Sequence, residues 1–238
     1  NLKSSYLELK DDFDQAYLRL MNSGNYILGE EVELFEKEYA SFLKTKYCIG
    51  VANGLEAISL ALIACGIESG DEVIMPSYTY IATWLAVTHI GAIPIPVEPC
   101  EDTYNINPLK IEEKISRKTK AIIPVHLYGL PVDMDEINKI AKEFNLLVIE
   151  DASEAQGARY KNRMVGSLGD MAVFSFFGNK MITTGEGGMV LTNDQNLAER
   201  CQILRDHGMS KERRYWHTVI GYNYRMTNMQ AAIGVAQM

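Results

Sequence analysis

Lys180 is the residue whose position is best suited to catalytic chemistry. It lies in the stretch MAVFSFFGNKMITTGEGGMVLT, which runs from Met171 to Thr192. It follows an apolar segment and precedes a glycine turn. A lysine in that place is a candidate Schiff-base residue, because burial disfavours the ammonium form and leaves a nucleophilic amine near neutral pH. Most lysines at strand ends are simply solvated. The assignment therefore depends on the residues around it.

Other chemically useful residues also follow apolar segments. Asn53 begins a glycine turn into a helix, and the free backbone N–H groups of such a start suit a phosphate. The candidates at this turn are Gly54, Leu55 and Glu56. Asp151 ends LLVIED, Ser175 lies five residues before Lys180, and Tyr80 follows EVIMP.

Each of these candidates also has a plain structural interpretation: an ordinary turn, a helix cap or surface charge, a core serine and a core aromatic ring. Together they are what pyridoxal 5'-phosphate requires. The lysine forms an imine, a carboxylate keeps the pyridine nitrogen protonated, a hydroxyl and N–H groups hold the phosphate, and an aromatic ring stacks on the cofactor. No histidine or cysteine has useful spacing to the carboxylates, so a metal site is not expected.

Apolar strand patterns alternate with amphipathic helix patterns along the chain. Strands are expected at 47–52, 72–76, 92–97, 121–127, 146–151, 172–177 and 188–192. Helix faces are expected from Leu9, Phe13, Tyr17 and Leu20; from Val32, Phe35, Tyr39, Phe42 and Leu43; from Leu55, Ile58, Leu62 and Cys65; and from Met134, Ile137, Ala141 and Phe144. This order predicts an α/β fold with a mostly parallel sheet flanked by helices, and ligands then bind beyond the carboxyl ends of the strands.

Composition narrows the class of protein. The chain has 238 residues, of which 47% are hydrophobic and 23% charged, as in an ordinary globular protein. The formal net charge of -8 argues against nucleic-acid partners. The four cysteines lack a C-x-x-C spacing, which indicates a reduced, cytoplasmic protein. The polar start does not resemble a signal peptide, and no apolar run has transmembrane length, so no membrane partner is expected.

The ordered motifs resemble the DegT/DnrJ/EryC1/StrS group of pyridoxal-phosphate sugar aminotransferases. The matching stretches are SGNYILGEEVELFEKEYASFL, PSYTYIATWLAV, TYNINPLKIEEKI, KAIIPVHLYGLPVDMDEI, VIEDASEAQGARY, GSLGDMAVFSFFGNKMITTGEGG and GYNYRMTNMQAAIG, which together cover nearly the whole chain. The resemblance implies a type I aminotransferase fold working as a homodimer, with residues 1–238 forming the cofactor-binding large domain behind an N-terminal helical segment and without the C-terminal small domain. It also implies L-glutamate as amino donor and a nucleotide-linked keto sugar as acceptor.

The resemblance also implies a role for each site residue. Lys180 would carry the cofactor and Asp151 would pair with its ring nitrogen. Glu154 falls where the family places a Gln, His or Glu near the phenolic oxygen. Tyr80 would stack on the ring, while Ser175 and the backbone at Leu55 and Glu56 would hold the phosphate. Asn223, in GYNYR, would reach the phosphate of a neighbouring subunit.

Several points stay open. Leu55 replaces the Thr of many relatives and removes one hydroxyl. FSFFGNKMITTGEGG and YNYRMTN resemble perosamine-type 4-aminotransferases, whereas VANGLEAI resembles 3-aminotransferases of dTDP-3-keto-6-deoxyhexoses; we favour a 4-keto-6-deoxy sugar. Lys211, Arg213 and Arg214 are candidates for the nucleotide diphosphate or for a solvated loop. A non-catalytic fragment or regulator of the same fold is the rival from another class. Lys180 disfavours a related dehydratase branch, which has histidine there, and no G-x-G-x-x-G supports a nicotinamide oxidoreductase.

Overall fold

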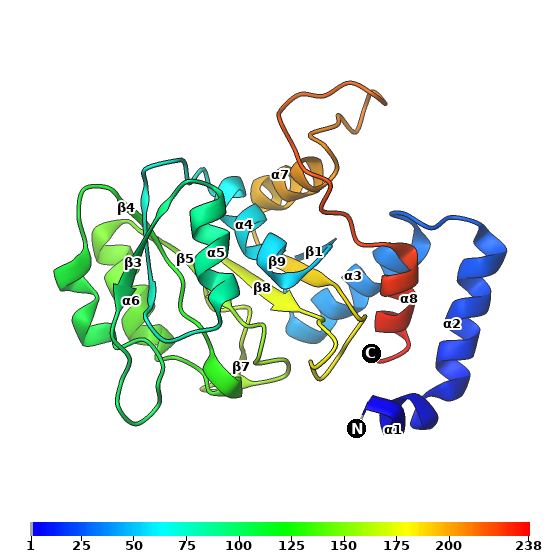
Figure 1. Cartoon of the computed structure of the whole chain (residues 1–238), viewed down its shortest axis with the longest axis horizontal. Coiled ribbons are helices and arrows are strands. Elements are labelled where there is room, and N and C mark those ends of the chain that lie inside the picture. Colours follow the sequence, from blue (N-terminus) through cyan, green and yellow to red (C-terminus); the bar gives the residue numbers. More distant parts are fainter. Residues whose placement is uncertain (1) are drawn as a thin grey trace.

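A mostly parallel seven-stranded sheet forms the centre of the molecule (Figure 1). The computed structural model describes residues 2–238, with side chains from residue 3. The strands lie in the order β1-β9-β8-β5-β4-β2-β3. Only β9 runs antiparallel to both of its neighbours. The strands are β1 (Tyr47–Val51), β2 (Glu72–Pro76), β3 (Ile93–Val97), β4 (Thr119–Ile122), β5 (Leu147–Asp151), β8 (Met171–Ser175) and β9 (Gly188–Thr192), with β6 (Arg159–Tyr160) and β7 (Arg163–Met164) paired separately.

Helices cover both faces of this sheet, as expected from the alternating pattern. They are α1 (Leu2–Glu8), α2 (Lys10–Ser23), α3 (Glu30–Leu43), α4 (Gly54–Ala64), α5 (Ile81–His89), α6 (Met134–Phe144), α7 (Gln195–Arg205) and α8 (Asn228–Val235), with short 3₁₀ turns at Pro108–Lys110, Glu112–Lys114 and Leu127–Gly129. One core joins α3, α6 and α8 to the sheet, and the other joins α4, α5 and α7 to the opposite face. Neighbouring strand residues alternate between them: Val148 belongs to the first core and Ile149 to the second.

Side-chain caps mark two of the helix starts. The Asp133 carboxylate accepts a hydrogen bond from the Glu136 N–H at the start of α6. Thr227 and Gln230 form a reciprocal capping box at the start of α8. The sheet contains all seven expected central strands, and the expected α/β class is confirmed.

Two expected strands end at least two residues before their apolar runs do. The run at 121–127 leaves the sheet after Ile122, because Pro124 has no N–H to donate. The chain nevertheless stays beside β5, where the Asp151 N–H donates to the Pro124 carbonyl and the His126 N–H donates to the Asp151 carbonyl. The run at 172–177 ends at Ser175, whose hydroxyl accepts from the Phe177 N–H and begins a turn.

The expected helix faces are partly wrong. Tyr17, Phe42 and Phe144 are 53%, 44% and 39% exposed. The expected faces used residues four apart, whereas a helix repeats every 3.6 residues. The buried face of α2 therefore includes Ala16 and not its neighbour Tyr17.

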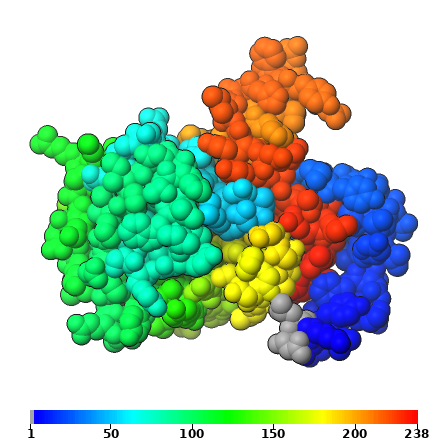
Figure 2. All heavy atoms as spheres, viewed as in Figure 1, coloured from blue at the N-terminus to red at the C-terminus, as the bar shows by residue number. Residues whose placement is uncertain are grey.

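Residues 207–221 form an arm between α7 and α8. It projects from the body of the molecule, as the orange segment of Figures 1 and 2 shows. Among residues 2–238, no helix has the length and apolarity needed to cross a membrane.

Candidate active site

Most of the predicted site residues meet in one pocket of about 430 Å³. The pocket lies where β1, β2, β5 and β8 end, and these carboxyl ends share one edge of the sheet because the four strands point the same way. Seven predicted residues line it: Gly54, Leu55, Tyr80, Asp151, Glu154, Ser175 and Lys180. Glu56 and Asn223 do not.

The start of α4 forms one wall. A Cβ added to Gly54 would lie 2.8 Å from the Cβ of Ser175, so only glycine allows this close approach between the helix and β8. The Asn53 side chain caps the helix by accepting from the Glu56 N–H at 2.9 Å. The N–H groups of the first turn point beyond the helix end and suit an anion, while the Ser175 hydroxyl lies beside them.

Glu56 does not line the pocket, and its expected role at the phosphate stays a prediction. Its backbone N–H is taken by the Asn53 cap, because an N-cap side chain competes for the same donor. Burial raises the pKa of its carboxyl group, and nearby Glu186 adds to the rise.

Asp151 presents a carboxylate at the end of the central strand β5. The residue is only 5% exposed. Its Oδ2 accepts from the Thr83 hydroxyl at 2.9 Å, and its Oδ1 accepts from the Ser153 N–H at 3.2 Å. These two hydrogen bonds fix the carboxylate while leaving lone pairs toward the pocket.

Lys180 and Glu154 lie on facing loops of the pocket. The Lys180 Nζ is 3.8 Å from the Glu154 Oε1, and the lysine side chain is 18% exposed. The other Glu154 oxygen accepts from the backbone N–H of Tyr128 at 2.8 Å. The lysine is therefore mostly enclosed and has a carboxylate partner held in place from behind.

Tyr80 is not a core residue. It stands at the N-cap of α5, lines the pocket and is 72% exposed. Its ring is thus available at the pocket mouth, and its stacking on a cofactor stays a prediction.

Asn223 lies outside the pocket, near the base of the arm, with its side chain exposed. Its Oδ1 accepts from the Arg225 Nε at 3.0 Å, and Arg225 also donates to Asp206 at 3.1 Å. Within the arm, the guanidinium groups of Arg213 and Arg214 lie over the rings of Trp216 and Tyr215 at 4.8 and 4.9 Å.

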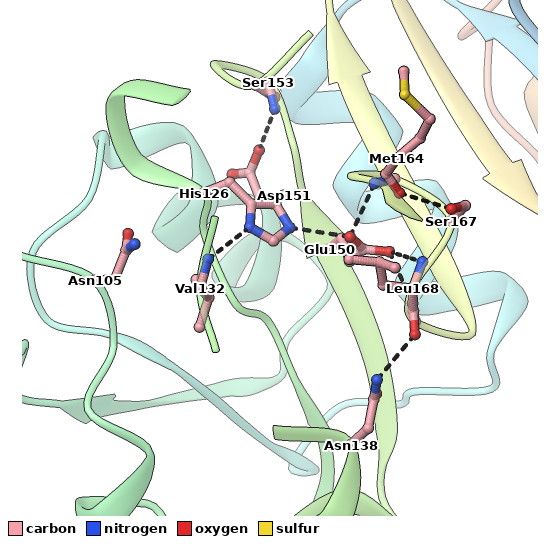
Figure 3. A network of polar contacts seen from close by, with 12 residues as sticks. Asn105, His126, Val132, Asn138, Glu150, Asp151, Ser153, Met164, Ser167 and Leu168 are labelled. Atoms are coloured by element: carbon pink, nitrogen blue, oxygen red, sulfur yellow. Dashed lines mark hydrogen bonds and ion pairs between the residues drawn. The ribbon is translucent and has the colours of Figure 1, made fainter. Parts of the chain in front are cut away.

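A buried polar network behind the pocket was missed from the sequence (Figure 3). Glu150 and His126 are both fully buried, and the His126 Nε2 lies 3.0 Å from a Glu150 oxygen. The His126 Nδ1 accepts from the Val132 N–H, so the ring is neutral and its proton is on Nε2. The Glu150 carboxylate also accepts the N–H groups of Gly166, Leu168 and Gly169. A carboxylate beside Asp151 and a histidine after an apolar run were the available signals, but no spacing rule joins them.

Known proteins are similar to this chain in sequence and in structure. The GDP-perosamine synthase of Caulobacter vibrioides is 54% identical over 211 residues, which cover 89% of this chain and 57% of that protein. The dTDP-3-amino-3,6-dideoxy-alpha-D-galactopyranose transaminase of Aneurinibacillus thermoaerophilus is 51% identical, and the match covers 98% of this chain and 64% of that protein. The solved structure of DesV from S. venezuelae in complex with a ketimine intermediate has a TM-score of 0.94 and 47% identity. The match covers 98% of this chain and 62% of that chain.

The chain spans less than two thirds of the length of these relatives. Their fold, a mostly parallel sheet flanked by helices, is the fold of this chain. The DegT/DnrJ/EryC1/StrS aminotransferase family matches residues 8–238, and the chain belongs to that family.

Proposed function

We propose that this chain is the cofactor-binding large domain of a pyridoxal-phosphate aminotransferase that transfers an amino group from L-glutamate to a nucleotide-linked 4-keto-6-deoxy sugar. The observation that carries the proposal is the convergence of Lys180, Asp151 and Ser175 with the start of α4 in one pocket. Asp151 ends β5, Ser175 ends β8 with Lys180 in the turn that follows, and Gly54 begins α4, so three separate parts of the chain meet in the pocket.

The residues fit pyridoxal phosphate in kind and in place. Gly54 has no side chain where a Cβ would press on Ser175, which leaves the helix start open for a phosphate. The buried Asp151 carboxylate supports a protonated ring nitrogen, and Lys180 supplies the amine. When bound, the cofactor supplies an electron-accepting ring that carries the amino group between the two substrates.

Each residue then has a defined task. Lys180 holds the cofactor through Nζ and, once released, moves a proton with the same atom. Asp151 keeps a proton at the ring nitrogen, and Thr83 fixes the angle of its carboxylate. Glu154, held by the Tyr128 N–H, places a carboxylate oxygen 3.8 Å from the Lys180 Nζ. Tyr80 would cover the cofactor ring at the pocket mouth, and Leu55 would contribute only its backbone N–H.

The test is covalent labelling followed by turnover. Adding pyridoxal phosphate to the purified protein and reducing with borohydride should attach the cofactor to Lys180, as read by peptide mass mapping. Before reduction, L-glutamate should convert the absorbance of the lysine-linked cofactor to that of its aminated form. Lys180→Ala should lose the label and lower turnover by at least about 10²–10⁴-fold.

The exposed Lys139 provides a matched control, because its side chain is 70% exposed and pairs with the surface residue Glu136. Lys139→Ala should keep both the label and the turnover. Unchanged turnover in Lys180→Ala would contradict the proposal. No label on the unmodified protein would instead favour the non-catalytic fragment or regulator of the same fold.

The carbon that receives the amine separates two candidate substrates. Similarity to a GDP-perosamine synthase supports a GDP-linked 4-keto sugar, and similarity to a dTDP-3-amino sugar transaminase supports the 3-keto alternative. Supplying the two keto sugars in parallel to the aminated protein discriminates between them: the true acceptor returns the cofactor to its lysine-linked absorbance.

A homodimer with shared sites is part of this proposal. The arm exposes apolar side chains, with Ile220 92% and Trp216 54% exposed, which favours an interface there. Asn223 near its base would then face a second subunit. The four free cysteines are consistent with the reducing cytoplasm as the site of action.

A further inference from the structure

Three exposed tyrosines stand together beside the mouth of the pocket. Tyr78, Tyr104 and Tyr128, here called the tyrosine rim, are 49%, 56% and 75% exposed. The ring centroids of Tyr78 and Tyr104 are 5.8 Å apart, and the hydroxyls of Tyr78 and Tyr128 are 3.5 Å apart. None of the roles assigned above uses these rings.

Two members of the rim have an unusual backbone. Tyr104 and Tyr128 have φ values of 59° and 53°, in the left-handed region that side chains with a Cβ rarely adopt. Such conformations cost free energy and persist only where the surrounding structure holds them, and they cluster at functional sites. Two strained aromatic residues in one exposed cluster therefore call for a ligand.

A buried brace holds the two strained turns together. Asn105 is 4% exposed; its Oδ1 accepts from the Leu127 N–H at 3.2 Å, and its Nδ2 donates to the Leu130 carbonyl at 2.9 Å. The Tyr104 turn is itself closed by hydrogen bonds between Cys100 and the backbone of Tyr104 and Asn105. The positions of Tyr104 and Tyr128 are thus set relative to each other before any ligand binds.

The rim is also tied to the pocket. The Tyr128 N–H holds Glu154, which lines the pocket, and Tyr78 directly precedes Thr79 and Tyr80, which line it too. His126, two residues before Tyr128, anchors the same turn to Glu150 on β5 (Figure 3). A molecule that extends out of the pocket would pass over the rim.

We infer that the tyrosine rim binds the nucleobase of the nucleotide-linked sugar; this inference rests on the proposed function. A cofactor and a nucleotide-linked sugar together need more room than this pocket of about 430 Å³, which lies at the small end of the range of about 300 to 1,000 Å³ for ligand pockets. The nucleotide must then lie outside. Aromatic rings stack on planar bases, and their hydroxyls bond to base edges. The Tyr104 turn also carries Glu101 and Asp102, which disfavour the diphosphate there and leave the base as its occupant.

The test measures binding of GDP and dTDP to the cofactor-loaded protein by titration calorimetry. Tyr104→Gly and Tyr128→Gly remove a ring while suiting the positive φ, so folding is not compromised. Each should weaken the preferred nucleotide by about 5- to 150-fold, the range for losing one base–aromatic stack. Tyr128→Phe keeps the ring and should retain most of the affinity. Tyr17→Ala, at a helical tyrosine 53% exposed on α2, is the matched control and should bind as the unmodified protein does.

The cofactor absorbance and its response to L-glutamate are recorded in every variant. If they are normal but neither nucleotide binds, or the two glycine variants bind like the unmodified protein, the rim inference is overturned while the proposed function stands. Loss of the L-glutamate response in the unmodified protein overturns the proposed function instead. A glycine variant that only shifts the oligomeric state, with nucleotide affinity intact, would make the rim a contact between copies and overturn the inference.

Discussion

Glu150 and Asp151 are adjacent carboxylates on β5 with opposite environments. Glu150 is fully buried and accepts hydrogen bonds from His126 and from three backbone N–H groups. Asp151 is nearly as buried but accepts only two, from Thr83 and Ser153. Because strand neighbours point to opposite faces, one carboxylate is saturated by the protein and the other keeps capacity for a ligand. Unused hydrogen-bonding capacity, rather than burial, distinguishes the site carboxylate.

The largest effect is expected at Glu150, the carboxylate whose hydrogen-bonding capacity the protein already uses. Glu150→Ala leaves three backbone N–H groups and the His126 Nε2–H without a partner, so the free energy of unfolding should fall by about 3–5 kcal/mol. Chemical denaturation measures this. Glu136→Ala, at a side chain 49% exposed, should change it by less than about 0.5 kcal/mol. A well-folded Glu150→Ala with turnover but no loss of stability would show that the network is not structural.

The ligand-facing carboxylate should show the reverse pattern. Asp151→Asn keeps size and most hydrogen bonds but removes the charge that the ring nitrogen needs. Turnover should fall by about 10²–10³-fold, or about 2.7–4 kcal/mol of transition-state stabilisation. The free energy of unfolding should fall less than in Glu150→Ala. Steady-state kinetics and chemical denaturation on the same sample measure the two effects. Near-normal turnover would contradict the role of Asp151 at the ring nitrogen.

The smallest effect is expected one step away from the site. Thr83→Val keeps the shape but removes the hydroxyl that donates to Asp151 at 2.9 Å. Loss of one such bond is worth about 0.5–1.5 kcal/mol, so turnover should drop about 2- to 12-fold. Thr192→Val removes a similar buried hydroxyl, which donates to the Asp170 carbonyl, and should leave turnover unchanged. Equal turnover in both variants would mean that Asp151 needs no support from Thr83.

Much of the fold was predictable because its signals are local. Apolar runs marked all seven central strands, and Asp133 and Thr227 are capping residue types at the starts of α6 and α8. Errors came where local geometry was left out of the apolar pattern. Tyr17 is exposed because the buried stripe passes through Ala16, and the run at 121–127 ends early because Pro124 cannot donate.

The site was predictable in its membership but not in its arrangement. Ordered motifs singled out Lys180, Asp151 and Ser175, and the structure places them in one pocket. The capping of the Glu56 N–H by Asn53 was not predicted from the sequence. The buried links from Asn105 to Leu127 and from His126 to Glu150 join residues more than twenty positions apart, which no short-range pattern encodes.

The sequence by itself determined the family, the alternating strands and helices, and the set of reactive side chains. Only the tertiary structure decided which of two neighbouring carboxylates is free for a ligand and which loops hold Glu154 and the tyrosine rim. The physical reason is that hydrogen-bond partners are consumed by groups distant along the chain. Which donors and acceptors remain for a substrate is therefore known only after the sheet has brought those loops together.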